Sequence, residues 1–445
     1  MNELNRRRTL AALTLAVAAL VAAPTPAPAG PLSLEDSLRL ALANQPSLAG
    51  ARARVDAAAA QVELVDVEAR PTITASAGYN VGVAAGQGLT DPSQAASAGV
   101  TGAWLLWDFG KLAARRDAAQ AGVVADQVAL TQTEQALLQQ VELAYAQVVG
   151  TAGQAQIRIA AVEAETRHVA ETERQVVAGT RTAVDTAQAR ARLASARLAQ
   201  VQADNAVALA VAELERAVGA PLPAGATFPA AAVVPVAGEA GPLDELVAAA
   251  VRADPSAAAL AAQRQAQALT RRATAISTRP TLAATAGLGV NALGTYGVPP
   301  DTQRVAATWN VGMNLSWQLY DGGARAAQVR AADATLRRVD ADLAARQVEL
   351  RYQVSAARLD VTAAKAQRVA ADDSVAAAGE QLRLAEARTA SGLGSSAELA
   401  DAQDAVTQAQ GDVVAADYQL ATARARLRSL LGTSATLLVG GTSNP

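Results

Sequence analysis

The sequence contains no cysteine and a single histidine, His168. Without thiols the chain has no thiolate nucleophile, no thiolate metal site and no disulfide. No Gly-rich phosphate loop follows a strand-like segment, and two methionines, Met1 and Met313, are too few to line a path for soft metal ions. His168 lies far in sequence from any turn, where a surface or interhelical role is expected. We therefore predict no enzyme, no cofactor and no metal site.

Aromatic residues make up only 3% of the 445-residue chain, although 51% of its residues are apolar. Much of the apolar fraction is alanine, which favours helix and lets backbones approach closely but fills little volume. This composition favours thin layers of packed helices over globular cores. The net charge of -3 mixes both signs, and lysine occurs only as Lys111 and Lys365. The absence of a basic patch argues against nucleic acid as a partner.

Residues 1–29 have the pattern of a signal peptide for export. Residues 6–8 are three arginines, residues 10–23 are apolar, and residues 27–29 form a small-x-small cleavage site. The apolar run is shorter than the roughly 20 residues of a spanning helix, so a retained membrane anchor is the less favoured alternative. The mature chain then begins near Gly30. Because cysteine is absent, no lipid can be attached to an N-terminal Cys, and membrane attachment must come from the fold.

The chain carries the same plan twice. Residues 34–219 align with residues 243–432, and the offset between them rises from 209 to 213 residues within a stretch of alternating residues. Each copy is far longer than a solenoid repeat. We predict a first repeat at 30–218 and a second repeat at 242–431. A linker rich in Pro, Gly and Ala joins them at 219–241, and a C-terminal tail follows at 432–445.

Four segments alternate between apolar and polar or small residues, the pattern of strands with one apolar face. They cover residues 72–83, 97–107, 281–291 and 305–319, none of which contains a charged residue. Each is about as long as the roughly 9 to 11 residues of a tilted transmembrane strand. Aromatic residues gather at membrane interfaces. All the tryptophans lie in or at the ends of these segments, at Trp104, Trp107, Trp309 and Trp317.

We interpret the four segments as outer-membrane strands, with a half-buried strand of a soluble sheet as the alternative for any one alone. Turn residues at 84–96 and 292–304 predict one strand hairpin in each repeat, at 71–107 and 280–319. Four strands cannot close a barrel, and open strand edges are not tolerated in lipid. Several chains must therefore share one barrel, with eight strands from two chains or twelve from three.

The remaining sequence predicts helices of unusual length. The 68 residues between Gly110 and Gly179 contain no proline, and neither do the 68 residues between Gly323 and Gly392. Each such helix would be about 100 Å long at 1.5 Å per residue. Shorter helices are predicted at 34–69, 184–218, 243–278 and 397–431. Each long helix forms a hairpin with the shorter helix that follows it, over 111–218 and 324–431.

Apolar residues spaced by seven predict left-handed coiled-coil packing of these helices. In the second repeat they are Leu399, Val406, Val413, Leu420 and Leu427, with Val329, Leu336, Leu343 and Leu350 on the long helix. The first repeat keeps a sparser set of Leu193, Val207 and Leu214. Many other seam positions are Ala, Gln or Asp, so each helix is expected to pack on two neighbours like a stave of a tube. An ordinary antiparallel coiled coil is the alternative.

These features together resemble the TolC-like outer-membrane efflux protein family over essentially all of the mature sequence. The resemblance is carried by the duplicated plan, by strand-to-helix turns at 107–110 and 319–323, and by helix-tip motifs at 178–185 and 391–398. The turns read Trp-Asp-Phe-Gly and Leu-Tyr-Asp-Gly-Gly, and each tip motif ends on an acidic residue.

The resemblance implies a mainly α fold with membrane β, built as a homotrimer. Its twelve-strand barrel in outer-membrane lipid would continue into a twelve-helix α-barrel tunnel that extends across the periplasm. The implied function is passive transport, as the exit duct of a tripartite efflux pump or type I secretion system. The implied partners are a periplasmic membrane-fusion adaptor and an inner-membrane pump of the RND, ABC or MFS type.

In this family the far end of the tunnel closes like an iris with polar and acidic side chains at the helix tips. The resemblance implies gate candidates at Arg181, Asp185, Glu398 and Asp401, and adaptor-docking tips at Gly179, Thr180, Gly392 and Leu393. Glu398 and Asp401 lie three residues apart and so share one helix face. Acidic residues near a helix N-terminus also stabilise the helix dipole, which is an equal alternative. The second tip reads Gly-Leu-Gly and lacks the arginine of the first.

A periplasmic coiled-coil adaptor or structural protein is the alternative function. Two helical hairpins rather than one, four charge-free alternating segments, and no compact sheet domain within a hairpin argue against it. A barrel enzyme ranks third because no nucleophile and base are paired in the sequence.

Overall fold

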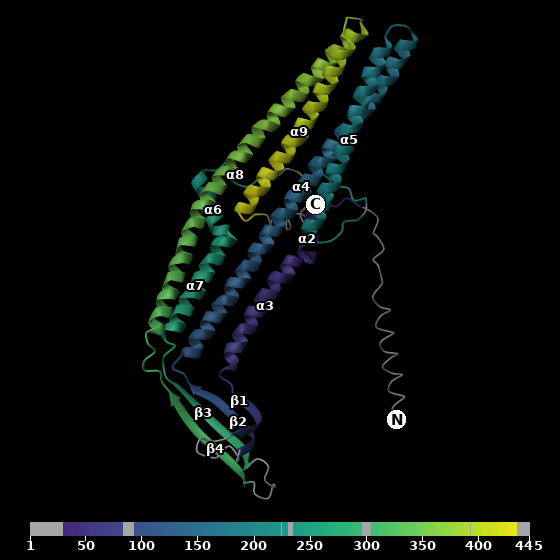
Figure 1. Cartoon of the computed structure of the whole chain (residues 1–445). Helices are drawn as coiled ribbons and strands as arrows, with labels where there is room; N and C mark the ends of the chain where they lie inside the picture. Colours follow the sequence, from purple (N-terminus) through teal and green to yellow (C-terminus); the bar gives the residue numbers. More distant parts are fainter. Residues whose placement is uncertain are drawn as a thin grey trace, which may run out of the picture.

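The computed structural model describes residues 30–82, 93–223, 225–229, 235–295, 304–391 and 393–433. The predicted signal peptide, Gly392 and residues 434–445 of the predicted tail lie outside the described residues. The chain forms an elongated molecule with long helices along one axis and a sheet at one end (Figure 1). None of the helices in the described ranges combines the length and apolar character that crossing a membrane requires.

Within the described ranges, each repeat contributes four helices and two strands. The two longest helices, α4 and α8, have 67 residues each, which confirms the predicted helix lengths. The helices of the first repeat are α2 (Leu34–Asn44), α3 (Pro46–Val67), α4 (Lys111–Val177) and α5 (Ala183–Val218). Those of the second are α6 (Leu243–Ala253), α7 (Pro255–Ala275), α8 (Ala324–Ala390) and α9 (Ser396–Leu430).

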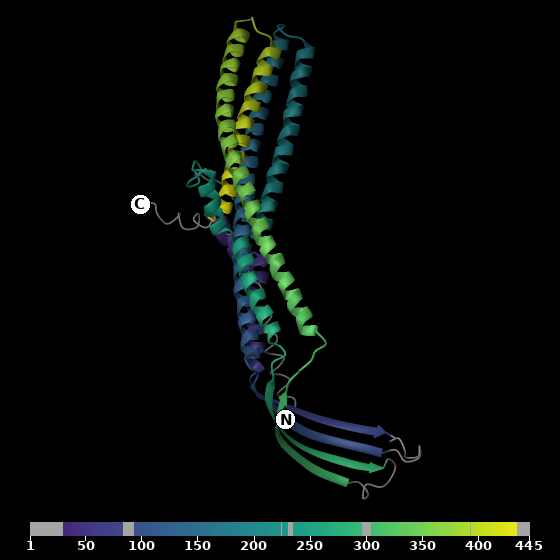
Figure 2. The ribbon, with the colours of Figure 1, turned by 90° about the vertical axis from the view of Figure 1, so that its left-hand side faces the viewer.

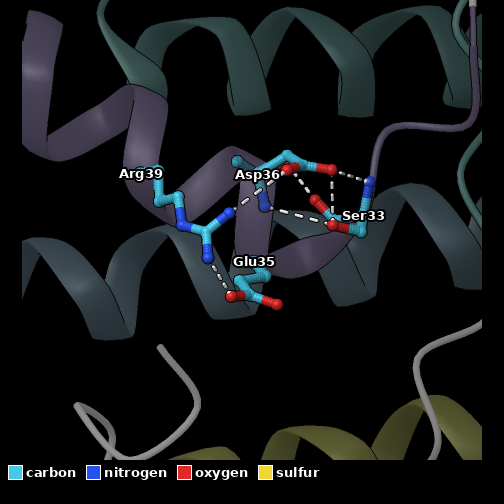
Figure 3. Close-up of polar contacts among 5 residues, drawn as sticks. Ser33, Glu35, Asp36 and Arg39 are labelled. Atoms are coloured by element: carbon cyan, nitrogen blue, oxygen red, sulfur yellow. Dashed lines mark hydrogen bonds and ion pairs between the residues drawn. The ribbon is translucent and has the colours of Figure 1, made fainter. Parts of the chain in front are cut away.

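The segments 34–69 and 243–278 each form two helices that meet at a proline. Pro46 and Pro255 begin α3 and α7, at the first helical turn where a missing N–H is tolerated. Ser33 and Asp36 form a capping box that begins α2, with the Asp36 amide 3.1 Å from the Ser33 hydroxyl. Figure 3 shows the Asp36 carboxylate between Ser33 and Arg39. These signals fix the entry of the chain into the helical layer.

The helices lie side by side in one layer. Near the sheet, α4 contacts α3 and α7, and α7 contacts α8. Toward the helix tips, α4 contacts α5 and α9, and α9 contacts α8 (Figures 1 and 2). The order α3, α4, α7, α8 near the sheet therefore becomes α5, α4, α9, α8 toward the tips. This side-by-side order is the one expected for the staves of a tube.

Large apolar side chains gather at mid-length, where the chain between the repeats folds back on the helices. In the first repeat Val141, Tyr145 and Val148 of α4 are buried beside α2 and α5. The Tyr145 hydroxyl lies 2.7 Å from the carbonyl of Pro229 and 3.1 Å from that of Leu32, so these two acceptors share its single proton. A matching core around Val354, with α6 and α9, lies in the second repeat.

In the second repeat the seam that runs from this core toward the tips consists mainly of alanine. The predicted seam of α8 is buried at Leu350 and continues toward the tip through buried alanines spaced by seven, at Ala357, Ala364, Ala371, Ala378 and Ala385. The facing helix α9 buries its own series at Ala402, Ala409, Ala416 and Ala423. The sevenfold spacing is thus present, but the predicted residues are buried only at Leu350, Leu420 and Leu427, while the others of the second-repeat set are half-buried. Alanine brings the two helices close together, which explains the high alanine content of the chain.

The four strands form one antiparallel sheet in the order β1-β2-β3-β4. They are β1 (Thr72–Gly82), β2 (Ser93–Trp107), β3 (Thr281–Thr295) and β4 (Arg304–Ser316). The predicted loops were too long, since β2 begins at Ser93 rather than 97 and β3 ends at Thr295 rather than 291. Ser93 pairs with Thr295, so backbone pairing continues beyond the alternating side chains. β4 ends at Ser316, three residues before the predicted end.

Candidate functional site

The sheet has one apolar face and one polar face. Strand pairing aligns Ala75 with Val100, Val100 with Leu288, and Leu288 with Trp309, so the apolar residues of all four strands lie on the same side. The opposite side carries polar or small residues, for example the row of paired residues that crosses the four strands at Thr74, Thr101, Gly287 and Asn310. Trp309 is 77% exposed in the isolated chain, and most large apolar residues on that face are also exposed. An apolar surface of this kind needs a lipid environment.

The sheet also has two open edges. β1 and β4 are its outer strands, and each pairs with only one other strand among the described residues. Unpaired strand edges bind further strands, and in lipid they must be paired. The sheet is therefore a segment of a larger structure.

Aromatic side chains mark the end of the sheet nearest the helices. The Trp104 indole donates to the carbonyl of Ala69 at 3.0 Å. Trp107 and Phe109 contact edge to face, with ring centroids 6.2 Å apart. Trp317 follows β4 directly and is exposed. Aromatic girdles of this kind lie at the boundary between lipid and water.

An Asp-x-Gly turn leads from each hairpin into a long helix. Asp108 accepts from the amides of Gly110 at 3.0 Å and of Leu112, and so caps α4. Asp321 accepts from the amides of Gly323 at 2.9 Å and Arg325 at 2.8 Å, and so caps α8. Gly110 and Gly323 have φ of 85° and 89°, a left-handed conformation that favours glycine. The motif that carries the family resemblance therefore starts the long helices.

The predicted gate and docking positions lie at the other end of the helices. At the tip between α4 and α5, Gly179 has φ of 76°, and the Thr180 amide donates to the Gln175 carbonyl at 3.0 Å. The Asp185 carboxylate accepts from the Thr182 amide at 2.9 Å and from its hydroxyl at 2.8 Å. These bonds, with a smaller contribution from Arg181, hold the pKa of Asp185 below its ordinary value.

The tip between α8 and α9 uses different contacts. The amides of Leu393 and Gly394 both donate to the Arg388 carbonyl at 2.9 Å, and Leu393 is exposed. The Ser395 hydroxyl accepts from the Glu398 amide at 3.0 Å, which caps α9. The Glu398 carboxylate lies 3.3 Å from the Arg388 guanidinium, so it is paired within its own hairpin. Gly392, a predicted docking residue, lies outside the described residues.

Only one predicted gate residue connects the two hairpins. Asp401 of α9 lies 3.8 Å from Arg192 of α5. Arg181 stays with the first hairpin, where its charge acts on Asp185 and His168. In the single chain, the four predicted residues therefore do not form one cluster: Arg181 acts on Asp185, Glu398 pairs with Arg388, and Asp401 pairs with Arg192.

The structure reveals a charged groove near the tips that the sequence patterns did not single out. It has a volume of about 380 Å³, and its polar lining comes from α4, α5 and α9, at Arg158, Glu165, Arg192, Gln403 and Asp404. Glu165 is buried, and its Oε2 has no hydrogen-bond partner. Burial, with Asp404 nearby, raises the pKa of Glu165, although Arg192 offsets part of the rise. Burial and the charges of Arg181 and Arg192 lower the pKa of His168.

Two buried ionic contacts join segments that are distant in the sequence. Glu142 of α4 pairs with Arg428 of α9, which connects the two repeats. Glu239, in the chain between the repeats, accepts from Arg424 of α9 at 3.0 Å and from Lys365 of α8 at 2.5 Å. Burial acts to raise the pKa of Glu239, but these hydrogen bonds and that of the Val236 amide lower it to about 2.

Residues 37–220 and 246–433 match the family described as outer membrane efflux protein. The chain belongs to this family. The two matched ranges coincide with the two repeats and cover most of the chain. The match supports an outer-membrane efflux protein and gives no support to the alternative of a periplasmic adaptor. No curated protein sequence matches the chain. Across the described residues, no three His, Cys, Asp or Glu side chains meet in an arrangement that could hold a metal ion.

Solved structures of outer-membrane channels share the fold of this efflux protein. The outer-membrane channel OprN is 22% identical, with a TM-score of 0.72 over 90% of this chain and 90% of that chain. VceC from Vibrio cholerae is 18% identical, with a TM-score of 0.69 over 90% and 96% of the two chains. The open state of MtrE from Neisseria gonorrhoeae is 18% identical, with a TM-score of 0.72 over 91% and 90%.

Proposed function

We propose that three copies of this efflux protein assemble into one channel that spans the outer membrane and extends into the periplasm. The observation that carries the proposal is a sheet with a continuous apolar face and an open edge on each side. Three chains of four strands each give a closed barrel of twelve strands, in which β4 of one copy pairs with β1 of the next. The apolar face then contacts lipid, and the Thr, Ser, Asn and Gly face lines the pore.

The helical layer continues the pore on the periplasmic side. At each level four helices lie side by side, so three copies supply twelve staves. Exposed apolar residues such as Leu198 and Leu209 of α5, and Val348 and Leu359 of α8, lie on the outermost helices of the layer. Contact between α8 of one copy and the α5 side of the next would bury them. No chemistry on the substrate is involved, and transport through the channel is passive.

The partners follow from the two ends of the molecule. Exposed Leu393, with Gly179 and Thr180 of the first hairpin, supports docking of a periplasmic membrane-fusion adaptor at the tips. Gly392, the remaining predicted docking residue, directly precedes Leu393 in the sequence. An inner-membrane pump behind the adaptor supplies the driving force. The Asp185 carboxylate caps α5 and the Glu398 carboxylate pairs with Arg388, so we assign the gate chiefly to Asp401, assisted by Glu398 and by Arg181 beside Asp185.

Disulfide trapping tests the assembly directly, because the cysteine-free chain gives a clean background. Single cysteines would be scanned along the polar faces of β1 and β4, beginning with Ser76 and Thr308, and then combined in pairs. We expect at least one pair to give a ladder of two and three linked chains upon oxidation in the outer membrane. Each single-cysteine variant is the control and should stay at the mass of one chain. If no pair cross-links while the protein is folded in the membrane, β4-to-β1 closure is wrong.

A further inference from the structure

The junction between the sheet and the helices carries three cations, exposed Arg279 and Arg325 and half-buried Lys111, for which no ion pair with a carboxylate forms within the described part of the chain. The Lys111 ammonium donates to the Arg279 carbonyl at 2.8 Å, and the Arg279 guanidinium donates to the Phe109 carbonyl at 2.8 Å. Arg325 donates to the Ala275 carbonyl at 3.3 Å. A carbonyl oxygen orients a cation but leaves its unit charge in place. The charges of Lys111 and Arg279 therefore still attract an anion, and that of Arg325 does so in part, because it also acts on the Asp321 carboxylate.

The acidic residues of the same junction are engaged elsewhere. Asp108 and Asp321 accept from the first amides of α4 and α8. Glu68 and Asp66 pair with two other arginines of α4, at 2.6 Å and 3.1 Å. Asp333 pairs with an arginine of α7 at 2.5 Å. The carbonyl-bound cations thus add positive charge to a region in which these five acids are already bonded.

The cations lie beside the aromatic residues at the end of the apolar sheet face, and this position indicates which ligand they bind. Trp107 pairs with Leu282 across the strands, and Phe109 contacts the ring of Trp107. Arg279 is bonded to Phe109, and Lys111 to Arg279, so both cations lie next to this aromatic pair. On the same strand as Trp107, the Trp104 indole donates to the Ala69 carbonyl, and the exposed Arg70 follows Ala69 in the sequence. Aromatic residues at strand ends lie at headgroup depth, and long cationic side chains beside them reach the phosphates.

We propose that Arg70, Lys111, Arg279 and Arg325 form a cationic collar that binds the phosphate headgroups of anionic phospholipids in the periplasmic leaflet of the outer membrane. The inference rests on the proposed function, because the collar meets headgroups only if the sheet lies in the membrane. Arginine and lysine next to a membrane surface attract anionic lipid, and guanidinium groups bind phosphate in a bidentate manner. Three copies place three collars around one barrel, which favours a shell of anionic lipid at its periplasmic rim.

Native mass spectrometry of the detergent-purified assembly measures this preference. Phosphatidylglycerol and phosphatidylcholine with the same acyl chains would be titrated separately, and bound lipids counted. We expect the wild type to retain phosphatidylglycerol preferentially. Replacing Arg70→Gln together with Lys111→Gln should lower the preference by about fivefold for each cation removed. The charge-keeping pair Arg70→Lys with Lys111→Arg should restore it.

The control removes two cations far from the sheet. Arg167→Gln with Arg197→Gln changes exposed arginines of α4 and α5 in the tip-ward half and should leave the lipid preference unchanged. Equal binding of both lipids by the wild type, or an undiminished preference in the Gln pair at the collar, would overturn the inference. Displacement of phosphatidylglycerol by excess inorganic phosphate would assign the collar to free phosphate and also overturn it. Failure to float with vesicles of either composition would instead contradict the proposed function.

Discussion

Glu165 is placed where its ionised form is unfavourable. Burial raises its pKa above the ordinary value of 4.5, and the unpartnered Oε2 has no donor to stabilise a negative charge. A carboxyl with a raised pKa in the folded state contributes stability below pH 4.5, and that contribution is lost as pH rises through the raised pKa. The contact between α4, α5 and α9 should therefore be weaker at neutral pH than in acid.

We expect Glu165→Gln to increase the stability of the protein at pH 7.5 by about 1 kcal/mol, since a neutral amide avoids the cost of a buried unsatisfied charge. At pH 4 the variant and the wild type should melt alike. Glu163→Gln, at an exposed position of the same helix, is the matched control. Thermal melts at both pH values make the comparison. A variant that is less stable than the wild type at pH 7.5 would show that the Glu165 charge is stabilising.

The gate assignment is also a claim about single residues. In a trimer, three copies of Glu398 and Asp401 surround one axis, where like charges repel and divalent cations bind. Replacing Glu398→Gln together with Asp401→Asn should abolish block by divalent cations in single-channel recordings. Arg181→Ser should raise the resting conductance by weakening a contact that keeps the tips closed. Asp412→Asn, farther along α9, should leave both properties unchanged. Unaltered block and conductance in the tip variants would reduce these residues to helix caps.

At the scale of a strand, the two faces of β4 should respond in opposite ways to charge. Arginine in place of Val311 or Leu315 puts a cation into hydrocarbon and should cost about 2 to 4 kcal/mol. Arginine in place of Asn310 or Asn314 faces the pore and should assemble normally. The yield of assembled channel in outer-membrane fractions reports the difference. Equal loss from both pairs would mean that the faces are reversed.

At the scale of a helix, the alanine seam of α8 should not tolerate larger side chains. Ala371→Leu adds volume to a buried position between closely spaced helices and should cost about 1 to 3 kcal/mol. Ala376→Leu, at an exposed position one turn away, is the control. The melting temperature of the purified protein measures both effects. Equal melting temperatures for the two variants would contradict the assignment of the seam.

Period-two and period-seven patterns were sufficient to predict the strands, their apolar face and the long helices, because each pattern is local. Strand ends were less accurate, as the pairing of Ser93 with Thr295 depends on backbone bonds rather than on side-chain type. Contacts between distant segments had no local signal. Glu239 meets Arg424, 185 residues away, and Asp401 meets Arg192 across the two repeats. For the same reason the sequence identified the gate candidates but not the groove around Glu165.

At the scale of the whole molecule, a single chain is incomplete. Its sheet has two open edges, its apolar strand face is exposed, and its helical layer ends on both sides in helices with exposed apolar residues. Each of these surfaces is unfavourable in water. A second and a third copy remove them together, since the same neighbour can pair with the strand edge and cover the outermost helices.

The mass of the folded protein in detergent tests this account most directly. Native mass spectrometry of the mature protein, extracted from the outer membrane, should give a species with three times the mass of one chain. Dissociation should remove strand signal from the circular dichroism spectrum while leaving helix. A stable folded monomer with its strand signal intact would contradict the account.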